Sequence, residues 1–266
     1  MINLMYACND DFLKGVALSL LSIVRQTKEE LNIYVLSLDL TNLDEKYKMV
    51  DINKIKEVNI NSKITLIDLK EIYSNTISGK KIENNLYTSY AFLRLLSDKI
   101  LDLPDKIIYL DSDIMALKDI KPLFDTNISN YDYGMCQDYI GKFWLGASYC
   151  NSGVLLLNMK RLRKNHVLNK CLDCLIKNES LMPDQDALNK ETNNLLILDN
   201  KYNEQKRIKD DTVLFHFSKK YKWTPYFHFT NYKQWDVKEV HEVYKIFEFD
   251  DIYKEYEEIK EAIEAK

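Results

Sequence analysis

The hydrophobic positions of the first hundred residues follow two alternating spacings. Apolar residues recur every three or four positions over residues 13–24, 43–55 and 90–96, which predicts helices. Short and nearly continuous apolar runs predict buried strands at residues 2–7, 33–40, 64–69 and 107–110. Strands and helices in this alternating order predict an α/β fold, with a mostly parallel sheet and helices on both faces.

The pattern changes after Pro122. Residues 131–151 are rich in aromatic residues and are interpreted as loop-like. The aromatic side chains of 131–150 could either stack on a saccharide or pack in the core. Further elements are predicted as a strand at 153–157, a helix at 159–177, a strand at 213–217 and an amphipathic helix at 252–263. We expect one domain over residues 1–235, with halves at 1–125 and 126–235, and a helical tail at 236–266.

Composition and charge restrict the class of protein. The chain has 266 residues, of which 46% are hydrophobic and 29% charged, as in soluble globular domains. Its net charge of −4 argues against a general nucleic-acid binder. We see no signal peptide and no apolar run of membrane-spanning length, so we expect a cytoplasmic protein with peripheral membrane contact at most.

The five cysteines do not resemble a disulfide framework, because an odd number cannot pair fully. Cys171 and Cys174 have the C-x-x-C spacing, but there is no second pair to complete a tetrahedral metal site. We interpret them as thiols packed in a helix.

Two carboxylates, Asp111 and Asp113, follow the fourth predicted strand directly. In an extended chain, residues i and i+2 point to the same side, so the two could bind one hard cation such as Mg²⁺ or Mn²⁺. Polar residues 9–11 follow the first strand, and both groups would face the crevice at the carboxyl ends of the strands. The D-x-D pattern alone is weak, since Asp184 and Asp186 repeat it, and a solvated strand end remains the alternative.

Further blocks occur in a fixed order around this pair. They are the turn ACNDDF at residues 7–12, SYAFLRLL with Arg94, the block NSGVLL at 151–156, MPDQDALN at 182–189 and HFSKKYKW at 216–223. Together with Asp111-Ser112-Asp113, this order resembles glycosyltransferase family 8, which includes bacterial galactosyltransferases and glycogenin. The resemblance implies a GT-A type, Rossmann-like fold with a mostly parallel sheet, flanking helices, a smaller acceptor-side region and a C-terminal helix. The first half of the chain would bind the nucleotide sugar.

The resemblance also implies the site residues. Asp111, Asp113 and His216 would bind Mn²⁺ or Mg²⁺, and Gln185, Asp184 and Arg94 would act at the reaction centre. The implied contacts to a UDP-sugar are Ala7, Asn9, Asp11, Arg94, Asp111, Ser112, Asn151, Ser152, Asp184, Gln185, His216 and Lys222. Within these blocks, Asn9 stands where the family usually has Asp, and Asp11 where it has Asn or a similar residue.

The last block departs most from the family pattern H-x-x-G-x-x-K-P-W. Lys219 replaces its glycine, and no proline separates Lys222 from Trp223. This block belongs to a basic segment formed by Lys201, Lys206, Arg207, Lys209, Lys219, Lys220 and Lys222. The segment is either a solvated loop or a cationic lip over an anionic ligand.

The implied function is metal-dependent transfer of a hexose, from UDP-glucose or UDP-galactose, to a hydroxyl of a saccharide or glycoconjugate acceptor. The family retains the anomeric configuration, and a neutral amide such as Gln185 is a poor nucleophile, so we favour attack on the same face. Two alternatives stay open: a haloacid-dehalogenase-like phosphatase, and a UDP-binding protein on a catalytically decayed scaffold. Residues 250–264 are acidic, so we expect the tail to dock on the body or to form a homodimer.

Overall fold

The computed structural model of the chain describes residues 1–41, 48–56, 58, 62–77, 90–177, 183–222 and 228–264. Within these segments the main sheet has seven strands, in the order β3-β2-β1-β4-β7-β6-β8. Their bounds are β1 (Ile2–Ala7), β2 (Leu31–Ser37), β3 (Lys63–Asp68), β4 (Lys106–Leu110), β6 (Tyr133–Gln137), β7 (Cys150–Asn158) and β8 (Leu195–Leu198). Two short pairs accompany it: β5 (Ile114–Ala116) with β9 (Leu214–His216), and β10 (Lys220–Lys222) with β11 (His228–Thr230).

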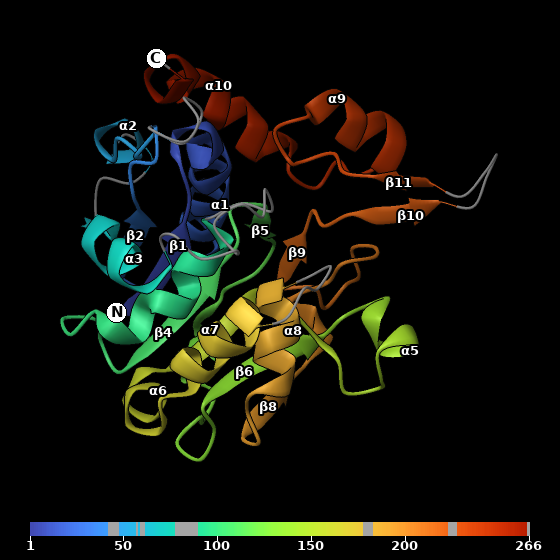
Figure 1. Cartoon of the computed structure of the whole chain (residues 1–266). Helices are drawn as coiled ribbons and strands as arrows, with labels where there is room; N and C mark the ends of the chain where they lie inside the picture. Colours follow the sequence, from blue (N-terminus) through green and yellow to red (C-terminus); the bar gives the residue numbers. More distant parts are fainter. Residues whose placement is uncertain are drawn as a thin grey trace.

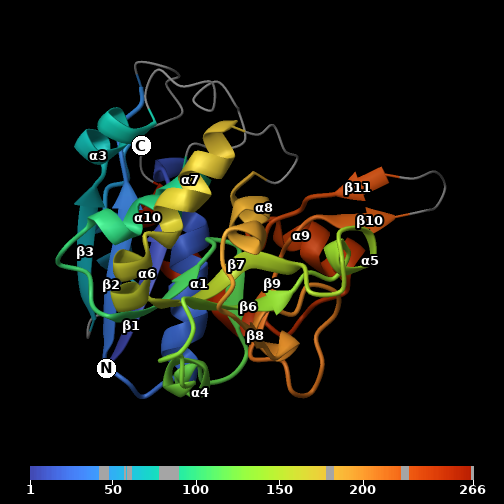
Figure 2. The ribbon, with the colours of Figure 1, turned by 60° about the horizontal axis from the view of Figure 1, so that its bottom comes forward.

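Helices cover both faces of the sheet (Figures 1 and 2). The α-helices of the described segments are α1 (Leu13–Gln26), α2 (Asn53–Lys56), α3 (Lys70–Thr76), α4 (Lys121–Asp125), α5 (Gly141–Trp144), α6 (Met159–Asn165), α7 (Val167–Lys177), α8 (Pro183–Lys190), α9 (Val237–Glu239) and α10 (Asp250–Glu264). The chain also forms 3₁₀ helices at Asp10–Phe12, Ala91–Lys99 and Asn200–Tyr202, and a π-helix at Val240–Tyr244. None of the described helices is both long and apolar enough to cross a bilayer.

The strand directions confirm the predicted mostly parallel α/β fold and refine it. Strands β3, β2, β1 and β4 run parallel, and so do β6 and β8. Strand β7 is antiparallel to both of its neighbours, β4 and β6, so the sheet is mixed. Because β1 and β4 are adjacent and parallel, the residues that follow them lie at the same edge of the sheet.

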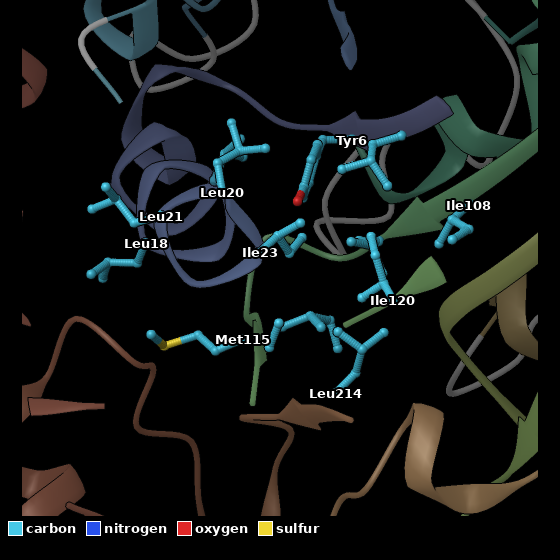
Figure 3. Close-up of a cluster of buried hydrophobic side chains, with 14 of the residues drawn as sticks. Tyr6, Leu18, Leu20, Leu21, Ile23, Ile108, Met115, Ile120 and Leu214 are labelled. Atoms are coloured by element: carbon cyan, nitrogen blue, oxygen red, sulfur yellow. The ribbon is translucent and has the colours of Figure 1, made fainter. Parts of the chain in front are cut away.

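Alternating side chains of each strand fill two cores. Leu4 and Ile108 point toward α1 and α10, whereas Met5 and Ile107 point toward the helices on the opposite face. Figure 3 shows the first core, where Tyr6 and Leu20 lie among aliphatic side chains from α1, β4, β5 and β9. This two-sided burial explains why the strands read as continuous apolar runs.

Three sequence expectations need correction. The aromatic stretch interpreted as loop-like contains β6 and α5, because Tyr133–Gln137 pairs with β7 and β8. The helix predicted at 159–177 is two helices, separated at His166 by a left-handed backbone with φ of 52°. Strand β2 spans Leu31–Ser37, so the predicted strand at 33–40 extended too far. Part of the helix predicted at 43–55 lies outside the described residues.

The C-terminal helix docks on the body of its own chain. Ile252, Tyr256 and Ile263 of α10 are buried in the core that contains α1, and Arg25 of α1 pairs with Glu255 at 2.5 Å. This arrangement is the first of the two alternatives predicted for the acidic tail. The apolar stripe on α10 therefore contributes to the stability of the whole chain.

We expect Ile252→Ala to lower the free energy of unfolding by about 2–5 kcal/mol, because it removes buried methyl groups and leaves a cavity. Glu258→Ala, at an exposed position of the same helix, should change it by less than about 0.5 kcal/mol. Urea denaturation of both variants measures the difference. Equal effects would show that α10 is not packed on α1 in solution.

Candidate functional site

The acidic pair lies in a turn at the end of β4. The N–H of Ile114 bonds the carbonyl of Asp111 at 3.2 Å, so residues 111–113 are not the extended segment that the i, i+2 argument assumed. The turn nevertheless brings the carboxylates together. Ligand atoms of Asp111, Asp113 and His216 all lie within 4.8 Å of one another, and among the described residues these three form a group that could hold a metal ion.

His216 reaches the acidic turn through the short β5–β9 pair. In its register Ile114 lies opposite His216, so the imidazole is adjacent to the turn that precedes β5. Its Nε2 is 3.2 Å from Asp113 Oδ1. Gly153 makes room for the ring, because a Cβ at that position would be 2.4 Å from His216 Cε1. The glycine of the NSGVLL block thus leaves space for the ring of His216, which lies on a different strand.

A chain of amides fixes the orientation of this imidazole. Asn151 Oδ1 accepts from the Gly153 N–H at 2.9 Å and from Asn203 Nδ2 at 2.9 Å. Asn203 must then present its Oδ1 to His216 Nδ1, at 3.0 Å, so Nδ1 carries the proton and donates it. This bond turns Nε2 toward Asp113, as a second-layer partner does for metal-binding histidines. Asn203 belongs to none of the sequence blocks, so no motif pointed to it.

Arg94 joins two of the predicted site carboxylates. It is 5% exposed, and its guanidinium lies 2.9 Å from Asp111 Oδ1 and 3.4 Å from Asp184 Oδ2. It also donates to the carbonyl of Ser152 at 2.6 Å and lies over the Tyr109 ring. The structure thus buries Arg94 between the two carboxylates.

Burial and neighbouring cationic groups have opposite effects on the pKa values of the buried site carboxylates. Burial raises the pKa of Asp184, and the nearby Arg94 only partly counteracts it. Burial would also raise the pKa of Asp113, but Lys233 and His216 outweigh it and hold that pKa well below its usual range. Asp113 is therefore a stable carboxylate at neutral pH, as a metal ligand needs to be.

Gln185 lies in α8 within a closed hydrogen-bond network. Its Oε1 accepts from Asn151 Nδ2 and from the Ser152 N–H, both at 3.2 Å. Its Nε2 donates to Asp138 Oδ2 at 3.3 Å and to the Tyr149 hydroxyl at 3.2 Å. Asp138 was not predicted, because it lies in the aromatic stretch that was interpreted as a loop. By contrast, Asp186 turns toward Tyr149, whose hydroxyl donates to it.

Lys233, which was not predicted, lies beside the acidic turn. Its ammonium lies 2.6 Å from Asp113 Oδ2, and the neighbouring Gln234 donates to the carbonyl of Ser112 at 2.5 Å. Trp235 packs edge-on against Phe12, with ring centroids 5.7 Å apart. The side chain of Lys222 is outside the described residues. The sequence did offer a signal, because residues 233–235 read K-Q-W, close to the family's K-P-W.

The remaining predicted residues are less closely engaged. Ala7 ends β1, Asn9 is buried in the turn after it, and Asp11 is exposed. In the basic segment, Lys209 pairs with Glu204 and Lys201 lies 3.6 Å from Asp199. Two of the four basic residues between 201 and 209 thus have a carboxylate neighbour.

The positions of the strand ends, the acidic turn and the histidine agree with the family that the sequence resembles. Residues 3–238 match the model of "Glycosyl transferase family 8". The chain belongs to this family. Family 8 membership removes the ground for the phosphatase alternative, and it explains why the motif follows the fourth strand.

The chain is similar in sequence to other glycosyltransferases and similar in fold to a solved galactosyltransferase structure. It is 25% identical to a putative glycosyltransferase of Haemophilus influenzae over 71% of its own length and 58% of that protein, so it spans little more than half of that relative. It is 26% identical to an Escherichia coli lipopolysaccharide 1,2-glucosyltransferase over 81% of its length and 71% of that protein. The solved structure of galactosyltransferase LgtC with donor and acceptor sugar analogues shares its fold, with a TM-score of 0.59 and 17% identity over 81% of this chain and 86% of that one.

We expect Arg94→Met to lower the free energy of unfolding by about 3–5 kcal/mol at pH 7.5, because buried carboxylates lose their cation. Without Arg94 the pKa of Asp184 rises further. Since a raised folded pKa costs stability as pH increases from the unfolded value of about 3.9, the loss should be smaller at pH 5. Urea denaturation at both pH values tests this, with Arg94→Lys as a charge-conserving control. A loss independent of pH would contradict the argument.

Proposed function

We propose that the chain transfers a hexose from a UDP-sugar to a hydroxyl group of a saccharide or glycoconjugate, with retention of anomeric configuration. The observation that carries this proposal is the convergence of Asp111, Asp113 and His216 within 4.8 Å, next to the Arg94–Asp184 pair. Relatives named as lipopolysaccharide 1,2-glucosyltransferase and 1,3-galactosyltransferase support a hexose donor and a saccharide acceptor.

The three converging residues fit a divalent cation. Two carboxylates and one imidazole are ligands that suit Mn²⁺, and Mg²⁺ less well because it prefers oxygen alone. The fit is supported by His216, whose Nδ1–H is committed to Asn203 while its Nε2 faces Asp113. A cation bound there would neutralise the charge that develops on the departing diphosphate.

The surrounding residues would hold the donor. Lys233 offers an ammonium beside the acidic turn, where the diphosphate of a bound UDP-sugar would lie. Arg94 and Asp184 would orient the sugar hydroxyls, and Asn151 and Ser152 would limit its rotation. Arg94 belongs to residues 1–125, whereas Lys233, Asp184, Asn151 and Ser152 come from beyond residue 125, so both halves of the chain would contribute to the donor site.

The network around Gln185 supports attack on one face of the sugar. Both polar atoms of its amide are engaged by neighbours, and an amide is a poor nucleophile. In the step we propose, the bond from the anomeric carbon to the phosphate oxygen breaks while the acceptor oxygen bonds the same carbon. The acceptor proton passes to an oxygen of the departing UDP. Gln185 and Asp138 position the reactants, and neither changes its bonding.

A cytoplasmic location is part of the proposal. The five cysteines are all free thiols, as expected in a reducing compartment. Four of them are buried, and Cys171 lies in the core between α7 and α8. They serve packing, in agreement with the interpretation of the C-x-x-C spacing.

Incubation with a panel of UDP-sugars and Mn²⁺ should release free UDP, and NMR of the product should show a retained anomeric configuration. Asp113→Asn and His216→Ala should each lower this activity by at least about a hundredfold and abolish Mn²⁺-dependent UDP binding, since each removes a metal ligand. His241→Ala, which breaks a surface His241–Asp250 pair, is the matched control and should have no effect.

Three results would contradict the proposal in different ways. Metal-dependent UDP binding without turnover of any donor would favour the decayed scaffold. Inversion of the anomeric centre would contradict the same-face step alone. Full UDP binding by both metal-ligand variants would exclude the cation site at Asp111, Asp113 and His216.

We expect Lys233→Met to weaken UDP binding in the presence of Mn²⁺ by about 10- to 100-fold, because a charge-assisted hydrogen bond contributes about 1.5–3 kcal/mol. Lys222→Met should change it by less than about threefold if Lys233 is the cation at the diphosphate. Isothermal titration calorimetry compares the two variants. The reverse ranking would restore the assignment of Lys222.

A further inference from the structure

A concave surface lies outside the proposed donor site, between the α5 loop and the C-terminal end of α8. It is a groove of about 560 Å³, within the usual size of small-molecule sites. Its lining residues come from the loop before β7, from α8 and its end, and from β8: Leu145, Ser148, Tyr149, Asp186, Asn189, Lys190, Thr192, Asn193, Leu195 and Ile197. Figure 1 shows α5 beside this region, at the edge of the molecule.

The groove shares a wall with the reaction centre. Tyr149 lines the groove, and its hydroxyl accepts a hydrogen bond from Gln185 Nε2 at 3.2 Å while it donates to Asp186. Asn189 holds the same wall in place through bonds to the backbone of Cys150 at 2.7 Å. A ligand in the groove would therefore lie one side chain away from Gln185.

An exposed apolar shelf borders the groove. Phe143, Trp144 and Leu145 are 74%, 78% and 62% exposed, and they are consecutive. Isolated exposed apolar residues are ordinary, but a contiguous group usually marks an interaction surface. Leu145 belongs to both the shelf and the groove, so the two form one continuous surface.

Hydrogen bonds and close packing hold the helix that carries the shelf in place. Asp138 Oδ1 accepts from the N–H groups of Ile140 and Gly141, at 2.9 and 2.6 Å, and so fixes the first turn of α5. The other oxygen of Asp138 accepts from Gln185 and Asn151. Gly141 packs so closely on the Tyr149 ring that a Cβ would lie 2.4 Å from its Cδ1. One carboxylate thus links the exposed aromatic residues to the reaction centre.

The mixed chemistry of this surface selects the class of ligand. Sugar rings have apolar faces that pack on aromatic and aliphatic side chains, and hydroxyl rims that bond amides, hydroxyls and charged groups. The shelf and Ile197 offer the first kind of contact, and Ser148, Lys190 and Asn193 the second. A lipid or an apolar peptide would cover these polar groups without replacing their bonds to water, at a cost in free energy.

We infer that the groove and shelf bind the sugar units of the acceptor that lie beyond the unit receiving the hexose. The acceptor is then an oligosaccharide or a glycan chain. This inference rests on the proposed function for its catalytic consequence, but the binding it predicts can be measured without turnover. The terminal unit would meet the donor near Gln185, and the following units would pass Tyr149 onto Phe143 and Trp144.

The test uses the full chain with Mn²⁺ and UDP on an array of monosaccharides and oligosaccharides. We expect oligosaccharides to bind at least about tenfold more tightly than their terminal monosaccharides. The double variant Phe143→Ala/Trp144→Ala should lose this gain, while its monosaccharide and UDP binding and its hydrolysis of UDP-sugars by water stay unchanged. Leu101→Ala/Phe247→Ala removes similarly exposed apolar side chains elsewhere and should behave as wild type.

Several outcomes would overturn the inference. The first is that the wild-type protein binds oligosaccharides no more tightly than monosaccharides. The second is that the double variant still binds oligosaccharides more tightly. The double variant could instead lose binding to anionic phospholipid vesicles, or lose concentration-dependent dimerisation, while it keeps its saccharide binding. That result would assign the shelf to a membrane or to a second copy. Failure of UDP binding in the wild type would instead contradict the proposed function.

Discussion

The site depends on balancing buried carboxylates with cations that the fold itself supplies. Asp111 and Asp184 share the guanidinium of Arg94, and Asp113 lies between His216 and Lys233. Asp113 and Asp184 are buried and would be costly there alone, because a charge leaves water only if something replaces its hydration. Arg94, His216 and Lys233 come from a 3₁₀ helix, a short strand and a loop far apart in sequence, so the site exists only when the whole chain is folded.

Neutral amide side chains form a hydrogen-bond network across the rest of the site. Asn203 and Asn151 connect the imidazole of His216 to the amide of Gln185, with every donor and acceptor assigned a direction. A buried network in which each group is satisfied is rigid. His216 and Gln185 are thereby held in one fixed relation, and Asp138 continues the same network to α5.

Small residues allow the close approaches on which this arrangement depends. Gly153 leaves room for His216, and Gly141 for Tyr149. Gly15 is similar, since a Cβ there would lie 2.7 Å from the carbonyl of Ser112 and 2.6 Å from Trp235. Three of the chain's six glycines thus lie where α1, β7 and α5 meet the site.

The sequence by itself determined the alternating strands and helices and the edge at which the carboxylates would gather, and the resemblance of its motifs to family 8 indicated the trio Asp111, Asp113 and His216. Hydrophobic periodicity and short motifs are local, so they can be read without knowing which segments meet. The antiparallel insertion of β7 and the turn at the acidic pair needed the tertiary structure. The same is true of Asn203, Asp138 and Lys233, because their roles arise from contacts between segments that no local pattern brings together.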